Sequence, residues 1–334
     1  MVPILSISSI LNEPLDARTF ETDRLLLLVW VSVTKRSYRD YFFIHTFVLL
    51  VQTINRFGTS FLIWVYLQSM ISFNRRLIDR ANDIGSYLCV GIDISPELLG
   101  SDDLEDLITH SKLVVDATRD LALAYKPNFA FFERWGSKGF SWLEDLVKYI
   151  GGEHILIADA KRGDIGSTAS QYAESIFNYF GFDCVTLSPY LGRDSIDPFI
   201  SNEGKGVFIL CRTSNPSGIE FQNQKINDGL YLYENIAMWA NGLNKADNVG
   251  LVVGATAPEE LTAVRNIVPD LPLLIPGVGA QGGDLEHSVR VGNMSGIGLI
   301  NVSRSISFAG DLSESAIRNS AEDFVSRINK AIRE

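Results

Sequence analysis

From residue 70 onward, short apolar runs alternate with longer amphipathic stretches. A helix is expected first, over 73–84, where Phe73, Leu77, Ala81 and Ile84 would share one face. Near-continuous apolar runs then predict eight strands, at 87–92, 122–126, 155–160, 184–187, 206–211, 250–253, 273–275 and 298–302. Helical stretches follow them, at 101–120, 139–150, 168–180, 194–202, 229–242, 257–267, 284–290 and 313–332. Buried strands separated by helices indicate a parallel sheet covered on both faces.

Eight such units predict a single α/β domain over residues 70–334, folded as a (β/α)8 TIM barrel. A barrel of this kind typically needs about 250 residues. An open, doubly wound sheet is the alternative. It is disfavoured because Val90-Gly91-Ile92-Asp93, at the end of the first strand, lacks the Gly-x-Gly-x-x-Gly pattern of that fold.

Residues 1–69 have a different pattern of apolar and charged residues from the rest of the chain. Three apolar runs, at 25–33, 41–54 and 60–71, are interrupted by basic residues. None reaches the roughly 18 residues that mark a transmembrane helix. Nor do residues 1–21 resemble a signal peptide, because they contain acids and no basic region before the apolar stretch.

This atypical hydrophobic N-terminal extension has three interpretations. It could associate with a membrane, or it could form extra helices packed on the main domain. In the third, which we favour, translation starts at Met70 and the assigned start is wrong. The glycine content supports a break at this point, since Gly58 is the only glycine of the first 69 residues and the whole chain has 27.

The charge balance restricts the class of partner. The formal net charge is −11, and the acidic excess lies entirely after residue 69. No general nucleic-acid binding is expected, because that function needs a basic surface. Cys89, Cys184 and Cys211 lie beside apolar residues without disulfide or metal spacing, which favours a reducing cytoplasm. The four histidines lie in no recognisable catalytic context, and no metal site is predicted.

The loops after barrel strands form the active site of such folds, and the third loop carries the densest charge. Asp159 and Lys161 are two residues apart on a strand and therefore face the same side. Asp164 follows, and Asp93 and Lys126 end the first two strands. These five groups predict an alternating acid–base array in which a protonated lysine can act as an acid. A buried salt-bridge network is the alternative, because charges there must be paired.

A second cluster follows strands seven and eight. The segment 276–283 contains four glycines, whose backbone N–H groups can converge on an anion. Arg304, after the last strand, adds a bidentate cation. Phosphate binding at this place recurs in barrels, so we expect a phosphate site rather than a simple tight turn. Thr213 and Ser214, after strand five, suit hydrogen bonding to a planar heterocycle, although an ordinary capped turn would look similar.

The segment Asp159-Ala160-Lys161-Arg162-Gly163-Asp164-Ile165-Gly166 is similar to the signature of the orotidine 5′-phosphate decarboxylase family. Three further segments resemble its longer bacterial subgroup, type 2: Lys126-Pro127-Asn128 with Phe131-Phe132-Glu133, Ser188-Pro189-Tyr190, and 276–282. The resemblance covers residues 70–334 and does not extend to 1–69. The Asp-x-Lys-x-x-Asp pattern alone is less specific, because related sugar-phosphate decarboxylase barrels of the ribulose-phosphate-binding type share it.

The resemblance implies decarboxylation of orotidine 5′-phosphate to UMP and CO2, the last step of de novo pyrimidine synthesis, without metal or organic cofactor. The implied catalytic residues are Lys161 as proton donor to C6 of the pyrimidine, Asp159 facing the substrate carboxylate, Lys126, and Asp164. Lys126 and Asp93 are implied to contact the ribose and to orient the array. A homodimer is implied, in which Asp164 and the nearby Thr168 enter the partner's site. The implied substrate-binding residues are Asp93 and Asn128 at the ribose, Thr213 and Ser214 at the pyrimidine, Gln281 and Arg304 at the phosphate, and also Pro276 and Thr168.

Two other functions stay open on sequence grounds. Sister enzymes with the same barrel, such as 3-keto-gulonate-phosphate decarboxylase or hexulose-phosphate synthase, use a magnesium ion held by additional carboxylates. A catalytically silent barrel kept for binding, or tethered to a membrane by residues 1–69, is the other. The presence of Asp159, Lys161 and Asp164 disfavours a silent barrel.

Overall fold

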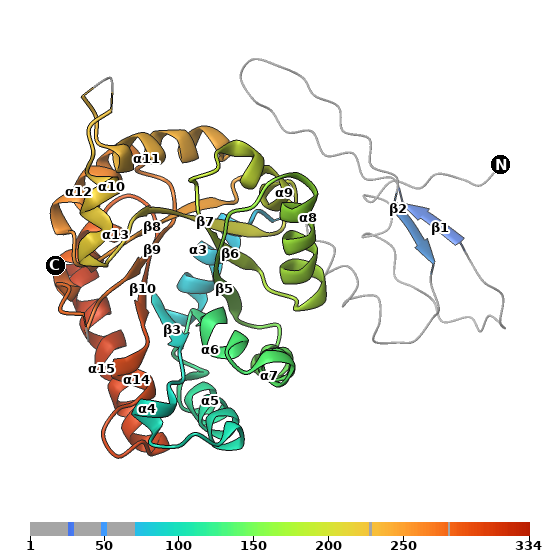
Figure 1. Ribbon diagram of the computed structural model, residues 1–334, viewed down its shortest axis with the longest axis vertical. Coiled ribbons are helices and arrows are strands. Elements are labelled where there is room, and N and C mark those ends of the chain that lie inside the picture. Colours follow the sequence, from blue (N-terminus) through green and yellow to red (C-terminus); the bar gives the residue numbers. More distant parts are fainter. Residues whose placement is uncertain (1–25, 30–47, 52–70, 227–228, 280) are drawn as a thin grey trace, which may run out of the picture. The chain divides into compact units, whose positions relative to one another are not determined.

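A computed structural model describes residues 26–29, 48–51, 71–226, 229–279 and 281–334 (Figure 1). The chain divides into two units, residues 1–68 and residues 69–334. In the first unit β1 (Leu26–Val29) pairs antiparallel with β2 (Val48–Val51). The expectations of extra helices, membrane association or a start at Met70 concern residues that lie largely outside the described ones, and they stay predictions. Among the described helices, none combines the length and the apolar character needed to cross a membrane.

The second unit is a closed barrel of eight parallel strands, which confirms the predicted (β/α)8 fold and excludes the open sheet (Figure 1). Each strand pairs with the next, and the last closes on the first. The strands are β3 (Leu88–Ile92), β4 (Ala124–Pro127), β5 (Ile155–Arg162), β6 (Cys184–Leu187), β7 (Gly206–Arg212), β8 (Val249–Val253), β9 (Leu273–Pro276) and β10 (Gly298–Val302).

Helices surround the strands and cover their outer faces. The main ones are α3 (Phe73–Ile84), α5 (Leu104–Thr118), α7 (Gly136–Ile150), α8 (Gly166–Glu174), α11 (Leu232–Leu243), α12 (Pro258–Ile267), α13 (Leu285–Gly292) and α15 (Glu314–Arg333). Short helical segments lie in the loops: α4 (Pro96–Leu99), α6 (Phe129–Glu133), α9 (Asp197–Ile200), α10 (Ile219–Gln222) and α14 (Arg304–Ser307).

Two predicted helices differ from the observed ones. The predicted helix at 168–180 is α-helical only to Glu174 and then widens into a π-helical turn, η1 (Ser175–Tyr179). The predicted helix at 194–202 reduces to a 3₁₀ turn, η2 (Arg193–Ser195), and the single turn α9. Pro198 explains the second difference, because proline has no N–H to donate and fits only the first turn of a helix.

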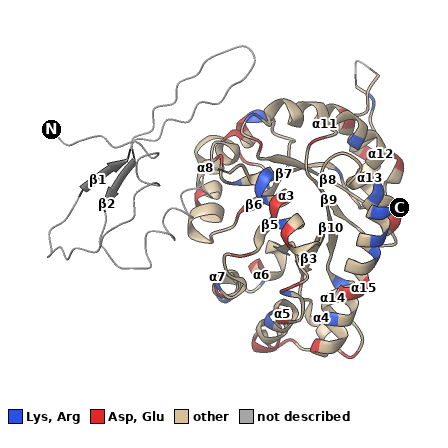
Figure 2. Ribbon diagram, turned by 180° about the vertical axis from the view of Figure 1, so that it is seen from behind, with Lys and Arg blue, Asp and Glu red and all other residues tan. Residues whose placement is uncertain are grey.

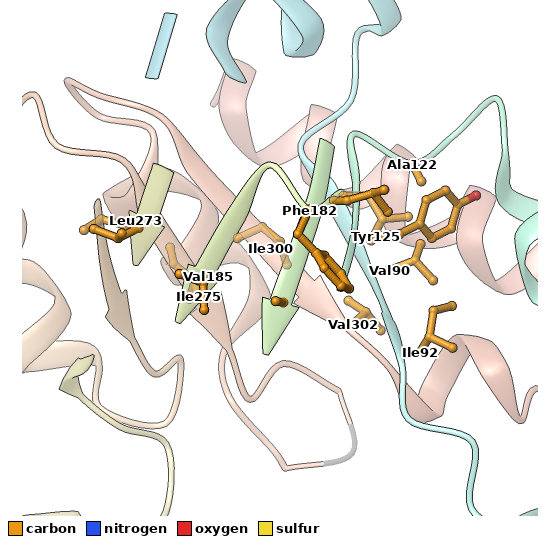
Figure 3. Packing of buried hydrophobic residues seen from close by; sticks show 14 of the residues in the cluster. Val90, Ile92, Ala122, Tyr125, Phe182, Val185, Leu273, Ile275, Ile300 and Val302 are labelled. Atoms are coloured by element: carbon orange, nitrogen blue, oxygen red, sulfur yellow. The ribbon is translucent and has the colours of Figure 1, made fainter. Parts of the chain in front are cut away.

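The alternation of side chains along each strand creates two apolar layers. Leu88, Val90 and Ile92 of β3 pack outward against the helices, and Figure 3 shows Val90 and Ile92 with equivalent residues of β9 and β10. Cys89, between them in sequence, points into the barrel interior. All three cysteines are buried and free, as a core role predicts.

Helix α3 closes the amino-terminal end of the barrel. Phe73, Leu77 and Ala81 belong to the interior apolar cluster. The ring of Phe73 meets Phe208 edge-on at 6.3 Å, and it lies so close to Gly206 that any side chain there would overlap it. The interior is therefore sealed and apolar at this end, and polar groups can gather only at the carboxyl-terminal end of the strands.

Arg265 on α12 ties two loops together at the amino-terminal end. It is fully buried, and its guanidinium donates to the carbonyls of Val268, Pro269, Leu271, Gly292 and Ile297. Those carbonyls precede or flank β9 and β10. A cation that bonds five backbone carbonyls, four of them in buried hydrogen bonds, replaces backbone pairing that the loops cannot supply.

We expect the substitution Arg265→Met to lower the free energy of unfolding by at least ~3 kcal/mol, because buried carbonyls would lose their donors. Urea unfolding followed by circular dichroism measures this effect. Arg333→Met, at an exposed position of α15, is the matched control and should leave the unfolding midpoint unchanged. Equal midpoints for the two variants would contradict the role of Arg265.

Candidate active site

A cavity of about 420 Å³ opens at the carboxyl-terminal end of the barrel. It brings together all the site residues predicted from the sequence except Asp164 and Thr168. Its predicted lining residues are Asp93, Lys126, Asn128, Asp159, Lys161, Thr213, Ser214, Pro276, Gln281 and Arg304. They come from the carboxyl-terminal ends of six different strands and the loops that follow them, so only closure of the barrel makes them neighbours.

Asp159 is the centre of the charged array. Its Oδ2 accepts a hydrogen bond from Lys126 Nζ at 2.5 Å, and its Oδ1 accepts one from Lys161 Nζ at 2.5 Å. Lys126 is 4% exposed and Asp159 is 9% exposed, whereas Lys161 is open to the cavity. Figure 2 shows basic and acidic residues on the helices around the barrel and also near its centre, where helix α3 lies in this view. The array is thus a pair of salt bridges sharing one carboxylate.

The pKa values of these groups follow from that pairing. Burial by itself would raise the pKa of Asp159, but the charges of Lys126 and Lys161 outweigh it and hold that pKa well below its usual range. Burial would likewise lower the pKa of Lys126, but Asp159 and then Asp93 raise it above its ordinary value. Asp159 and Lys126 are therefore both ionised at neutral pH.

Asp93 completes the array on the β3 side. It lines the cavity, and its charge acts on Lys126. Its Oδ1 is buried and has no hydrogen-bond partner within the described part of the chain. An unpaired carboxylate oxygen at a cavity wall is suited to accept a hydrogen bond from a ligand hydroxyl.

The glycine-rich turn after β9 adopts backbone angles that only glycine takes readily. Gly277, Gly279 and Gly282 all have φ near +80° to +100°, and Gly283 N donates to Gly277 O at 3.0 Å. Gln281 of this turn and Arg304 of α14 both line the cavity. Within the described residues the guanidinium of Arg304 makes no ion pair, so it can bind an anion there.

The loop after β7 is held by its own hydrogen bonds. The backbone N–H of Thr213 donates to Gln222 Oε1 at 2.9 Å, and Gln222 Nε2 donates to Thr213 Oγ1 at 2.8 Å. Thr256 Oγ1 fixes Ser214 by donating to its carbonyl at 2.8 Å. Asn128 caps α6, since its Oδ1 accepts from Ala130 N at 3.2 Å. These side chains approach the cavity in fixed orientations.

Asp164 and Thr168 lie outside the cavity of the single chain. Asp164 is half-buried, and its carboxylate accepts from the neighbouring Ile165 N at 2.8 Å. Thr168 is exposed on α8. Their predicted roles therefore cannot be exercised on the cavity of their own chain in this arrangement.

Several cavity residues escaped the sequence reasoning. Thr186 and Asn301 line it, together with the apolar Leu210, Val252 and Leu274. The signal that would have found Thr186 and Asn301 is strand alternation, because each is an inward-facing polar residue near the carboxyl end of its strand. Two of the histidines form hydrogen bonds with backbone carbonyls: His110 with Ser307 O and His154 with Arg119 O. The described residues contain no group of three or more His, Cys, Asp or Glu that could hold a metal ion.

Comparison with known proteins identifies relatives of this chain. Residues 86–318 match the family model described as "Orotidine 5'-phosphate decarboxylase / HUMPS family". The orotidine 5′-phosphate decarboxylase of Natronomonas pharaonis is 48% identical over 245 residues, which cover 72% of this chain and 90% of the relative. That of Roseiflexus castenholzii is 47% identical over 257 residues, 74% of this chain and 94% of the relative.

Two solved structures are also similar to this chain. Leishmania donovani OMP decarboxylase is 37% identical with a TM-score of 0.71, and the match covers 79% of this chain and all of that one. Leishmania donovani UMP synthase is 41% identical with a TM-score of 0.72 and covers 79% of this chain. This chain spans 57% of that longer protein.

We expect Asp159→Asn to make stability rise with pH. Without the carboxylate, burial lowers the pKa of Lys126 below 10.5. The unfolded state then binds more protons than the folded state between the lowered pKa and 10.5, so the free energy of unfolding increases with pH in that window. In the parent protein the pKa of Lys126 is raised. The contribution of the charged lysine to the free energy of unfolding is therefore fully present below pH 10.5. At pH 7 the variant should be roughly 3 kcal/mol less stable.

Urea unfolding midpoints at pH 7, 8 and 9.5 measure this dependence. Asp102→Asn, which removes an exposed carboxylate in the loop before α5, serves as the control and should follow the parent protein. Parallel profiles for Asp159→Asn and the parent would show that Lys126 does not depend on Asp159 for its charge.

Proposed function

The chain belongs to the orotidine 5′-phosphate decarboxylase / HUMPS family, and from this premise we propose that it decarboxylates orotidine 5′-phosphate to UMP and CO2. The reaction would be the last step of de novo pyrimidine synthesis. The observation that carries the proposal is the ionised carboxylate of Asp159 between Lys126 and Lys161, in a cavity that also holds Arg304 and a glycine-rich turn. Orotidine 5′-phosphate has a carboxylate that would leave beside the charged array and a phosphate that would be held by Arg304 and the glycine-rich turn.

In the proposed chemistry, Asp159 faces the carboxylate of the substrate. The bond from C6 to that carboxylate breaks, and CO2 leaves while the electron pair stays on C6. The ammonium of Lys161 stabilises this developing carbanion and then donates its proton to C6. Lys161 is placed for such a role because it is the array's exposed lysine. Asp159 and Lys126 are held before substrate binds, so little reorganisation is required.

Binding groups away from C6 would hold the substrate in register. We assign the phosphate to Gln281 and Arg304, with Pro276 beside them, and the pyrimidine to Thr213 and Ser214. Asp93 and Asn128 would contact the ribose. Binding energy from the phosphate and ribose can then be used to force two carboxylates, that of the substrate and that of Asp159, close together in the ground state.

We propose that the reaction needs neither a metal ion nor an organic cofactor. The competing sister enzymes of the same barrel use magnesium, so metal dependence separates the two functions.

The free cysteines support a reducing cytoplasm as the compartment. Mass spectrometry of the N-terminal peptide of the native protein tests the favoured start at Met70.

The purified protein should convert orotidine 5′-phosphate to UMP in the presence of EDTA at an undiminished rate. Lys161→Ala should abolish turnover, with a loss of at least ~10³-fold, while a UMP analogue still binds in calorimetry. Lys138→Ala, at an exposed position of α7, is the control. Turnover that requires magnesium would favour a sister activity, and near-normal turnover by Lys161→Ala would refute its role.

We further propose a homodimer in which Asp164 and Thr168 reach the partner's cavity. Asp164 is unused in its own cavity. Around it, large apolar side chains are exposed on the loops after β5 and β6, including Ile165 at 52% and Tyr190 at 82%. Burying such side chains against a second copy would be favourable.

The dimer proposal predicts complementation between two inactive variants. Lys161→Ala and Asp164→Asn should each lose activity alone, and the mixed dimer should regain one working site of two. That site combines Lys161 of one chain with Asp164 of the other. Denaturing and refolding the two variants together, followed by an activity assay, tests this. Activity in the Asp164→Asn variant alone, or no recovery on mixing, would count against the shared site.

A further inference from the structure

The strand that carries Asp159 and Lys161 is irregular at these residues. In the pairing of β5 with β6, Ala158 lies opposite Val185 and Arg162 lies opposite Leu187. Three residues, Asp159 to Lys161, therefore face the single residue Thr186. Lys161 takes a left-handed backbone conformation with φ of 46°, which a residue with a side chain rarely adopts. Such bulges redirect side chains and leave backbone groups without their ladder partners.

The side chain of Thr186 supplies the missing partners. The backbone N–H groups of Ala160 and Lys161 donate to Thr186 Oγ1, at 3.1 and 3.0 Å. The same hydroxyl lies 3.2 Å from Asp159 Oδ1 and donates to it. A hydroxyl has one proton and two lone pairs. Since both lone pairs accept from amides, the proton can only point at Asp159.

We infer that Thr186 is a positioning residue for the proposed decarboxylation: its hydroxyl fixes both the Asp159 carboxylate and the left-handed backbone of Lys161. This inference rests on the proposed function. Thr186 is 2% exposed, yet it lines the cavity, so it acts from directly behind the charged array.

The Thr186 hydroxyl links the positions of Asp159 and Lys161. Asp159 Oδ1 receives both Thr186 and Lys161 Nζ, while the Lys161 backbone is tied to the same Thr186 oxygen. One group thus sets the position of the carboxylate and of the chain segment that presents the ammonium. Without it, the backbone amides of Ala160 and Lys161 lose their acceptor, and the strained conformation of Lys161 loses its tether. We expect the ammonium to shift relative to C6 while the phosphate, ribose and pyrimidine contacts stay intact.

Two substitutions separate the hydroxyl from the volume of the side chain. Thr186→Val keeps the shape and removes the hydroxyl, whereas Thr186→Ser keeps the hydroxyl. We expect Thr186→Val to lower kcat by ~10- to 100-fold, with KM for orotidine 5′-phosphate within about threefold of the parent, because a hydrogen bond to a charged group is lost. Thr186→Ser should restore kcat to within about threefold. Binding of UMP should be equal in all of them.

A buried threonine far from the cavity controls for general destabilisation. Thr118 on α5 is fully buried and donates to Val114 O at 2.7 Å. Thr118→Val should lower the unfolding midpoint and leave kcat unchanged. If Thr186→Val does not fold, Thr186→Ala takes its place with the same expected fall in kcat.

The outcomes distinguish the inference from the function it rests on. Parent protein that does not turn over orotidine 5′-phosphate would overturn the proposed function and this inference with it. With an active parent, three results would overturn the inference alone: a folded Thr186→Val with unchanged kcat, a loss confined to KM, or a Thr186→Ser as slow as Thr186→Val.

Discussion

The ion pairing of Asp159 with two lysines is the interaction on which the rest of the site depends. A buried carboxylate costs folding free energy unless cations compensate it. Lys126 and Lys161 provide that compensation at 2.5 Å each, and Asp93 in turn balances Lys126. Asp159 is the shared partner, so its removal would leave the buried Lys126 without a direct ion pair. The same arrangement holds an ionised carboxylate and the ammonium of Lys161 side by side at the cavity, and the proposed chemistry uses both.

The barrel confines this polar cluster to one end. Helix α3 seals the amino-terminal end with Phe73 and Leu77, and the interior up to Leu210 and Leu274 is apolar. Below the array, burial raises the pKa of Cys89 to about 12, which keeps that thiol neutral. An apolar surround strengthens the electrostatic interactions above it, because water cannot screen them. The helices and strands thus supply the low-polarity environment, and the loops supply the charges.

Much of the fold could be predicted because it follows from local patterns. All eight strands lie within two residues of their predicted ends, since buried parallel strands are short, continuous apolar runs. The helix expected at 194–202 failed at Pro198, and the one at 168–180 turned π-helical after Glu174. Of the predicted site, the strand ends and the two-residue spacing of Asp159 and Lys161 were sufficient to place ten residues at one cavity. Asp164 and Thr168 were predicted from the resemblance to act across a dimer, and a single chain does not test that.

By itself, the sequence determined the barrel, most of the polar residues at its carboxyl-terminal end, and the family. It did so because side-chain alternation and the ends of strands can be read locally along the chain. Closure of the barrel then brings the residues at those strand ends close together. Only the tertiary structure decided how the charges pair and which neutral groups hold them. Thr186 shows the reason most clearly. Its hydroxyl satisfies the backbone of β5 across a bulge, and a bulge is a mismatch between two strands that neither strand encodes alone. The orientation of Asp159 and the left-handed conformation of Lys161 therefore depend on a contact between segments that are about 25 residues apart in the chain.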